Sequence, residues 1–272
     1  MTFKNRTVLV AGGARGIGST IAEKFAHLEA NVIICDTNYT QSSVNQYQSQ
    51  HISGFDAAQD LAQKLTLQGA KVTAFEANVC EPEEIDKLLK HIKSNTGRLD
   101  VVVNAFGVTH VSKVEDMTLE EFNAIINVNL TGVFIVSKAA IPYMRKNGGG
   151  AIINISSISG RRGFATVAHY CAAKYGVIGF TSSLAQEVAE DGICVNAVCP
   201  GIVRTNMWHY LLDKFKQPNE TREECWQRML KMIPQKTAQT PEDIADMVVF
   251  LGSARRITGQ AFSVDGGWNL TP

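Results

Sequence analysis

Short apolar runs alternate with longer stretches of helical periodicity along nearly the whole chain. The apolar runs, bounded by glycine, asparagine, aspartate or proline, are typical of buried strands. They predict strands over residues 7–11, 31–35, 71–76, 99–104, 151–157, 194–199 and 260–264. Apolar positions that recur every three or four residues predict helices over 19–29, 53–68, 82–96, 118–146, 168–190 and 240–251.

This alternation predicts a fold of the α/β class. We expect a doubly wound parallel sheet of about seven strands with helices on both faces. No repeat, low-complexity tail or linker divides the chain. Residues 1–272 are therefore expected to form a single domain.

Two segments depart from the alternation, and local signals mark some of the helix starts. Residues 37–53 are rich in Gln, Ser and Asn and lack a period, which predicts a long loop. Ser53 resembles the N-cap of the helix that follows this loop, and Thr118 opens a capping box. Residues 207–233 read as an aromatic helical excursion, placed where a lid would close over a substrate.

Glycine, proline and polar residues stand directly after several of the predicted strands. They are Gly12, Gly16, Gly18, Asp36, Asn104, Ser157 and Pro200. Because the carboxyl ends of parallel strands share one edge of a sheet, we expect these residues to gather there. This is the edge at which open α/β sheets bind ligands.

The glycines predict a phosphate-binding turn. They have the spacing Gly-x-x-x-Gly-x-Gly and stand between a strand and a helix. Glycines let the backbone approach a pyrophosphate, and the helix N-terminus offers free N–H groups to the anion. Asp36, about 20 residues further on, is suited to bind an adenosine ribose hydroxyl. Each signal alone also fits a tight turn or a cap, but together they favour a dinucleotide site.

Tyr170 and Lys174 are candidates for acid/base chemistry. They are four residues apart in a predicted helix, so their side chains share one face. A nearby ammonium lowers the pKa of a phenol, which would tune the tyrosine as a general acid/base. Ser157, at the end of an apolar strand, is placed to hydrogen-bond a substrate oxygen. Taken alone, such a pair is more often a packing feature than a catalytic one.

Composition and charge limit the classes of partner and compartment to be expected. Lysine plus arginine and aspartate plus glutamate both number 26, so the zero net charge gives no reason to expect nucleic acid or an anionic membrane. No apolar run approaches the ~18 residues of a membrane span. The six cysteines lack Cys-x-x-Cys spacing, and we expect reduced thiols in a cytoplasmic protein. Metal-ligand spacings are absent from the sequence, and no metal is expected.

The combined motifs resemble the short-chain dehydrogenase/reductase family, in its smaller single-domain form with a Tyr-x-x-x-Lys site. The resemblance extends over nearly the whole chain and implies a Rossmann-like NAD(P)-binding domain. It rests on the glycine motif, Ser157, Tyr170, Lys174, the Asn129 of an Asn-Val-Asn-Leu run, and Pro200 and Gly201 with Thr205 nearby.

The resemblance implies hydride exchange between a nicotinamide and the carbinol or carbonyl carbon of a secondary alcohol or ketone. Tyr170 would exchange the proton of that oxygen, Lys174 would lower the tyrosine pKa and bind the nicotinamide ribose, and Ser157 would orient the substrate. Asn129 would sustain a water-linked proton path to Lys174. The cofactor contacts implied are Gly12, Arg15, Gly16, Ile17, Gly18, Asp36, Asn78, Val79, Asn104, Gly107, Tyr170, Lys174, Pro200, Gly201, Val203 and Thr205.

The cofactor is expected to be NAD rather than NADP. The Asp36 carboxylate accepts a hydrogen bond from a ribose 2′-hydroxyl and repels a 2′-phosphate. Arg15 argues the other way, because a basic residue in the glycine turn could pair with that phosphate. Phe106 is a departure, since it puts bulk where the family has a small residue.

The substrate is expected to be a small-molecule alcohol or ketone, contacted by Ser157, Arg162, Trp208 and Tyr210. The resemblance also implies a homotetramer built on helices 119–146 and 168–190. Two rival functions stay open at this point. One is a non-catalytic dinucleotide sensor or scaffold, and the other is an epimerase or dehydratase relative on the same fold.

Overall fold

The computed structural model describes residues 2–269, and within this range the strands form one seven-stranded sheet in which every pair is parallel. The strands are β1 (Thr7–Ala11), β2 (Asn31–Asp36), β3 (Lys71–Glu76), β4 (Val101–Asn104), β5 (Gly150–Ile155), β6 (Ile193–Pro200) and β7 (Ala261–Val264). Their order is β3-β2-β1-β4-β5-β6-β7. The order reverses beside β1, so a crevice opens at the carboxyl ends of β1 and β4.

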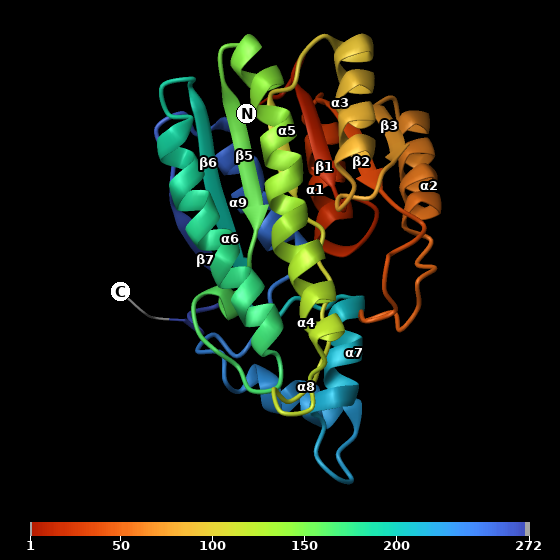
Figure 1. The fold of residues 1–272 in the computed structure, drawn as a ribbon, viewed down its shortest axis with the longest axis vertical. Coiled ribbons are helices and arrows are strands. Elements are labelled where there is room, and N and C mark those ends of the chain that lie inside the picture. Colours follow the sequence, from red (N-terminus) through yellow and green to blue (C-terminus); the bar gives the residue numbers. More distant parts are fainter. Residues whose placement is uncertain (1, 270–272) are drawn as a thin grey trace.

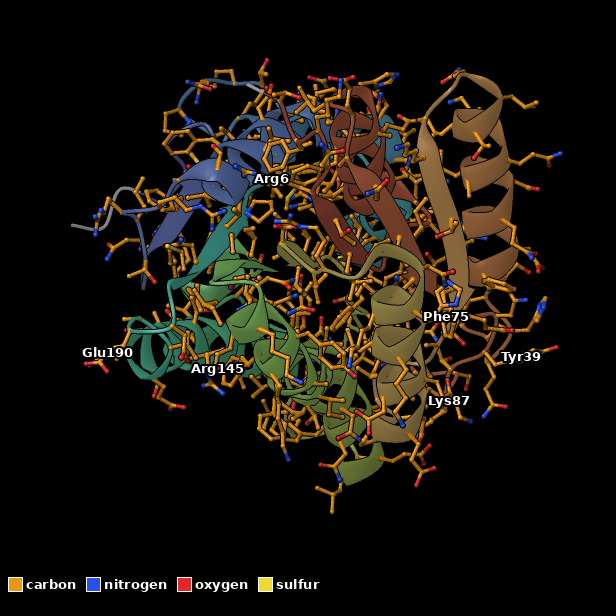
Figure 2. All side chains as sticks on the ribbon, turned by 90° about the horizontal axis from the view of Figure 1, so that it is seen from above. Arg6, Tyr39, Phe75, Lys87, Arg145 and Glu190 are labelled. Atoms are coloured by element: carbon orange, nitrogen blue, oxygen red, sulfur yellow. The ribbon has the colours of Figure 1, made fainter. Side chains whose placement is uncertain are left out.

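Helices cover both faces of the sheet, as predicted. They are α1 (Gly16–His27), α2 (Gly54–Leu67), α3 (Pro82–Thr96), α4 (Leu119–Ile126), α5 (Gly132–Lys146), α6 (Ala168–Glu187), α7 (Asn206–Phe215), α8 (Arg222–Leu230) and α9 (Pro241–Ser253). One core cluster joins α1, α2 and α9 to the sheet, and a second joins α3, α5 and α6 to its other face. Figure 2 shows the sheet between these two layers.

Alternate residues of a strand enter opposite core clusters, as the pleat requires. Val8 and Val10 of β1 belong to the cluster under α1 and α9, whereas Leu9 between them belongs to the cluster under α3 and α5. Both faces of the central strands are therefore apolar. This explains why the strands appear in the sequence as continuous apolar runs rather than as alternating patterns.

The helix predicted over 118–146 is interrupted. Thr118 and Glu121 form the expected capping box, but a π-helical turn at Asn127–Thr131 separates α4 from α5. The Asn129 side chain donates to the Ile125 carbonyl at 2.9 Å and to the Val108 carbonyl at 2.8 Å. Single π turns often occur at functional sites, and here the turn contains a predicted catalytic residue.

Among the described residues, the combined helix Leu119–Lys146 is the one whose length and composition would allow it to cross a membrane. Its most apolar window has a mean hydropathy of 1.7, and 39% of that window is buried. A core helix of a soluble protein passes the same test, so the match is weak evidence for a membrane. Val136, Ala140 and Met144 of this helix pack in the core beneath the sheet.

The long loop at residues 37–53 is present, and Ser53 stands at the N-cap position of α2 as predicted, but its side chain does not cap the helix. Ser53 has left-handed backbone geometry with φ 48°, and its side chain makes no capping hydrogen bond. Asn38, at the start of the loop, supplies the cap instead. Its Oδ1 accepts from the Asp56 backbone N–H at 3.1 Å, and its Nδ2 donates to the Asp56 carboxylate.

The excursion at 207–233 folds into α7 and α8. Thr221 and Glu224 form a capping box at the start of α8. A small third core cluster, which includes Leu212, Trp226 and Ile233, holds the two helices together. Figure 1 shows α7 and α8 beyond the carboxyl ends of the strands, with the 37–53 loop hanging at the same edge.

Candidate active site

A cavity of about 1200 Å³ runs along the carboxyl edge of the sheet. One end is lined by residues that follow β1 to β4 and by the 37–53 loop. The other end is lined by residues that follow β5 and β6 and by α7 and α8. Most of the predicted site residues line this cavity, although they come from distant parts of the chain.

The glycine turn forms a close-packed cradle at the first of these ends. Gly12 has φ 75°, and a Cβ there would strike the backbone of Phe106. A Cβ on Gly18 would strike the Gly12 carbonyl. Arg15, the N-cap of α1, makes no side-chain capping bond, and the first turn of α1 carries no acidic residue. The helix therefore presents uncapped N–H groups and its positive dipole end to the cavity, which suits a pyrophosphate.

Asp36 and Arg15 lie together beside this turn, but the Arg15 guanidinium is already hydrogen-bonded to the 37–53 loop. The Asp36 carboxylate accepts from the Ala14 N–H at 3.2 Å and the Thr37 N–H at 2.9 Å. Burial raises the pKa of Asp36, while these N–H groups and the Arg15 charge oppose the shift. The Arg15 guanidinium donates to the Ile52 and Ser53 carbonyls at 2.7 and 2.6 Å.

Phe106 fits because a glycine faces it. The Phe106 ring lies 3.0 Å from the position of a Cβ on Gly132, and the Val79 side chain lies 3.1 Å from the same position. The bulk of Phe106 is thus accommodated at the first residue of α5. Asn78, Val79 and Gly107 also line the cavity.

Ser157, Tyr170 and Lys174 meet where the two ends of the cavity join. All three line it. The Lys174 ammonium lies 5.6 Å from the centroid of the Tyr170 ring and donates to the Ile155 carbonyl at 3.0 Å. The Tyr170 hydroxyl is near the Met207 sulfur, at 3.9 Å. Strand β5 and helix α6 position the group, since Ser157 follows the strand and the other two are one turn apart.

The prediction that Lys174 lowers the tyrosine pKa is not met in this structure. Burial raises the pKa of Tyr170 to about 12, and the Ser157 hydroxyl opposes the rise. Burial lowers the pKa of Lys174 to about 8. Both groups are moved toward their neutral forms because an apolar environment disfavours charge.

Asn129 lies behind the catalytic group rather than in the cavity wall. A Cβ on Gly107 would be 2.9 Å from Asn129 Oδ1 and 3.5 Å from Lys174 Nζ, so these two polar groups lie close together. Both amide N–H groups of Asn129 are used by backbone carbonyls. Its Oδ1 is buried without a protein partner and is free to accept a hydrogen bond from a water.

Asn104 is a correction to the predicted cofactor contacts. Its side chain does not line the cavity but donates to Asn154 Oδ1 at 2.8 Å and Ser137 Oγ at 3.2 Å. Asn154 in turn donates to Thr181. The buried polar chain joins β4 and β5 to α5 and α6, because an amide at the end of a central strand must find partners inside the core.

The predicted substrate contacts are only partly met. Trp208 lines the cavity, but Tyr210 and Arg162 do not. The Tyr210 hydroxyl pairs with His110 Nδ1 at 3.2 Å, and His110 Nε2 is 3.2 Å from the Glu121 carboxylate. The Arg162 guanidinium lies over the Phe164 ring at 5.1 Å. Tyr210 is thus bonded to His110, and Arg162 lies against a ring that lines the cavity rather than lining it itself.

Several lining residues were not foreseen. They include Gln46 and Tyr47 of the loop, Phe164 before α6 and Trp268 after β7, whereas Phe215 and Met229 belong to the predicted excursion. The loop had no periodicity from which its path could be inferred. Within the described residues, no His/Cys/Asp/Glu group could hold a metal, and all six cysteines, each of them described, are free thiols.

The fold agrees with comparisons to known proteins. The family profile described as enoyl-(acyl carrier protein) reductase matches residues 12–269. A 3-oxoacyl-[acyl-carrier-protein] reductase of Synechocystis sp. is 37% identical over 96% of each chain. The FabG protein of that name from Chlamydia muridarum is 39% identical over 97% of each.

Two further relatives carry less functional information. The uncharacterized oxidoreductase YxjF of Bacillus subtilis is 36% identical over 98% of this chain and 99% of its own. The crystal structure of gox2181 superposes with a TM-score of 0.85 and 28% identity, over 98% of this chain and 96% of that one. The chain is an NAD(P)-dependent oxidoreductase and belongs to the short-chain dehydrogenase/reductase family.

Proposed function

We propose that the protein is an NAD-dependent enzyme that interconverts a secondary alcohol and its ketone. The observation that carries the proposal is the meeting of Ser157, Tyr170 and Lys174 at one point of the cavity, next to a cradle suited to a pyrophosphate. A protein that only sensed or displayed a dinucleotide would have no use for a proton-transfer group there.

The roles follow from the chemistry of each side chain. The nicotinamide, when bound, exchanges a hydride with the substrate carbon. Tyr170 takes the hydroxyl proton of the alcohol during oxidation and returns it to the carbonyl oxygen during reduction. Ser157 donates to that oxygen and fixes its distance from the phenol. Lys174 holds the nicotinamide ribose, and Asn129 Oδ1 accepts from a water that links Lys174 to solvent.

Exchange of Tyr170 tests this assignment. Tyr170→Phe keeps the ring but lacks the proton carrier, so we expect kcat to fall by about 100-fold or more. The Kd for NAD should stay within about twofold, because the ring and the fold remain. Net NADH formation with a secondary alcohol also separates this function from an epimerase or dehydratase. Near-normal turnover by Tyr170→Phe would refute the mechanism.

We further propose NAD rather than NADP as the cofactor. Asp36 lines the cavity beside the glycine turn, where its carboxylate can accept from a ribose 2′-hydroxyl. Arg15, the residue that would pair with a 2′-phosphate, is bound to two loop carbonyls and lies near the Tyr47 ring. Two of its five N–H groups are thus already used within the protein.

Measured values of kcat/KM with the two cofactors decide the preference. We expect NAD to exceed NADP by about tenfold or more, a factor that corresponds to about 1.4 kcal/mol. Asp36→Ala should reduce this ratio, whereas a variant at an exposed acid far from the site, such as Glu190→Ala, should not. A preference of the unaltered enzyme for NADP would overturn the assignment.

A further inference from the structure

Large apolar side chains form most of the wall at the end of the cavity beyond Tyr170, beside two arginines. The walls of this end come from the segment before α6, from α7 and α8, and from the chain after β7. The side chains that form them are Phe164, Trp208, Leu211, Phe215, Met229 and Trp268. Four of these six residues are aromatic, so the substrate space is bounded by flat, polarizable surfaces.

Packing behind these walls holds the rings in place. Trp208 meets Trp226 edge to face, with centroids 6.3 Å apart, and Phe164 meets Trp268 in the same way at 5.6 Å. Trp226 is buried in the small core between α7 and α8. Aromatic walls whose orientation is fixed in advance favour a ligand body that is itself flat or cyclic, since stacking then requires little reorganisation.

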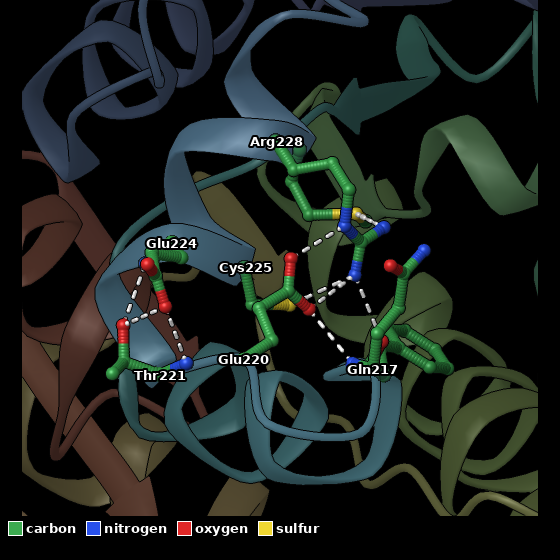
Figure 3. Close-up of polar contacts among 8 residues, drawn as sticks. Gln217, Glu220, Thr221, Glu224, Cys225 and Arg228 are labelled. Atoms are coloured by element: carbon green, nitrogen blue, oxygen red, sulfur yellow. Dashed lines mark hydrogen bonds and ion pairs between the residues drawn. The ribbon is translucent and has the colours of Figure 1, made fainter.

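The two cations at this end, Arg228 and Arg204, each form an ion pair with a glutamate. Figure 3 shows that Arg228 forms a two-pronged pair with Glu220, at 2.7 and 2.9 Å. Arg228 also donates to the Phe215 carbonyl at 2.9 Å. The pair holds the pKa of Glu220 down to about 2. Arg204 is 3.3 Å from Glu223 and lies over the Trp226 ring at 4.8 Å.

The other charged residues that line the cavity would not attract an anion into this space. Glu120, at the exposed rim, is acidic. Arg15 and Asp36 lie at the dinucleotide end. The Lys174 ammonium donates to the Ile155 carbonyl behind Tyr170. An anionic substrate would therefore lose its hydration at this end without gaining a free cation, a loss that binding must overcome.

We propose that the substrate is an uncharged secondary alcohol, or its ketone, carried on an alicyclic or aromatic ring body. The proposal rests on the proposed alcohol–ketone function and narrows its substrate class. During oxidation the carbinol carbon loses a hydride to NAD, and its hydroxyl proton passes to Tyr170. The products are therefore the ketone, NADH and one proton. Carboxylates, which find no free cation here, are poor substrates. Open-chain 3-oxoacyl compounds, of the kind in the name of the Synechocystis relative, are also poor substrates because they lack a ring body.

Three ketones, assayed with the protein and NADH, test the proposal. The first is a ring ketone that bears a methyl ester, the second is the same ketone with the free carboxylate, and the third is a 3-oxoacyl N-acetylcysteamine thioester. We expect kcat/KM for the neutral ring ketone to exceed the other two by about tenfold or more. Equal or better turnover of the carboxylate or the thioester would overturn the substrate class and leave the alcohol–ketone function intact.

Tryptophan fluorescence gives a readout that does not depend on turnover. The chain has three tryptophans, and all of them, Trp208, Trp226 and Trp268, line this end of the cavity or pack in the core cluster behind it. The neutral ring ketone should quench this emission at concentrations about tenfold below those needed by its carboxylate. Quenching with this preference but without turnover would refute the redox function alone. The reverse preference, or no quenching by any ring compound, would refute the substrate class.

Variants of Trp208 test whether this aromatic wall binds the ring of the substrate. Trp208→Ala should raise KM for the ring ketone by about tenfold and leave KM for NAD and turnover of a small acyclic ketone nearly unchanged. Trp208→Leu, which keeps apolar volume, should give an intermediate KM if the alanine variant folds poorly. Phe250→Ala, a half-exposed aromatic on α9 outside the cavity, is the matched control. Equal losses for ring and acyclic substrates would contradict a ring-binding wall.

Discussion

Tyr170 and Lys174 lie in an apolar environment that disfavours the charged form of each side chain. Their i, i+4 spacing could be read from the sequence, and the structure brings the ammonium to the face of the phenol ring at 5.6 Å. The effect of burial could not be read in the same way. It depends on Ile155, Met207 and other groups that come from distant segments, and it raises the tyrosine pKa that spacing alone had predicted to fall.

The raised pKa predicts a pH dependence that differs between the two directions. Oxidation needs the deprotonated Tyr170, and below a pKa of about 12 the phenolate fraction grows about tenfold with each pH unit. Log kcat/KM for oxidation should therefore rise between about pH 6 and pH 8. Reduction needs the protonated phenol, which is fully present in that range, so its profile should be flat.

Above pH 8 both profiles should bend downward from these trends. Lys174, with its pKa lowered to about 8, then loses the charge that holds the ribose. Initial rates in both directions with saturating cofactor, across this pH range, provide the measurement. An oxidation profile that is already level at pH 6 would mean that the tyrosine pKa in the working enzyme is far lower than burial alone makes it.

At the scale of elements, helix α7 is linked to α4 by contacts among three side chains. Tyr210 of α7 pairs with His110, and His110 pairs with Glu121 of the α4 capping box. The face of α7 that carries Trp208 and Leu211 is thereby held over the cavity. Tyr210 acts in this arrangement as a positioning residue, in place of the direct substrate contact expected from the sequence.

Tyr210→Phe tests this arrangement by removing one hydroxyl. We expect a loss of about 1 kcal/mol in the free energy of unfolding and a several-fold higher KM for the alcohol, with KM for NAD nearly unchanged. Tyr143→Phe on α5, outside the cavity, is the matched control. A variant whose substrate KM is unaltered would show that the hydroxyl does not position α7.

Most elements could be predicted because their signals are local. The capping box at Thr118 and the apolar runs of the strands are contained within a few consecutive residues. The missed features depend on residues that are distant or outside the predicted element. Asn129, within the π turn, donates to the Val108 carbonyl 21 residues away, and Asn38 accepts from the Asp56 N–H from 18 residues upstream.

At the scale of the whole molecule, a band of exposed apolar side chains crosses the outer surface of α4, α5 and α6. Leu119, Phe122, Phe134 and Tyr175 are 74, 38, 45 and 46% exposed. Helices that bury one face on a sheet seldom keep such residues on the other unless a partner covers it. We propose that these helices pair between copies of the chain in a homotetramer.

Sedimentation at micromolar concentration should give four times the chain mass. Phe134→Glu places a charge in the centre of the proposed contact and should shift the mass to a smaller species. Leu67→Glu, at an 84% exposed position of α2, should leave the tetramer intact. A monomeric mass for the unaltered protein would exclude this assembly.

The 37–53 loop is hydrogen-bonded to the rest of the chain at two places beside the dinucleotide end of the cavity. Gln46 accepts from the Thr109 N–H at 3.1 Å and donates to the Gly107 carbonyl at 3.5 Å, while Arg15 binds the far end of the loop. The loop thus lines the dinucleotide end of the cavity and the α7–α8 pair lines the other. We therefore expect ordered binding, in which the dinucleotide arrives first and departs last, because its end of the cavity is the one that the bonded loop borders.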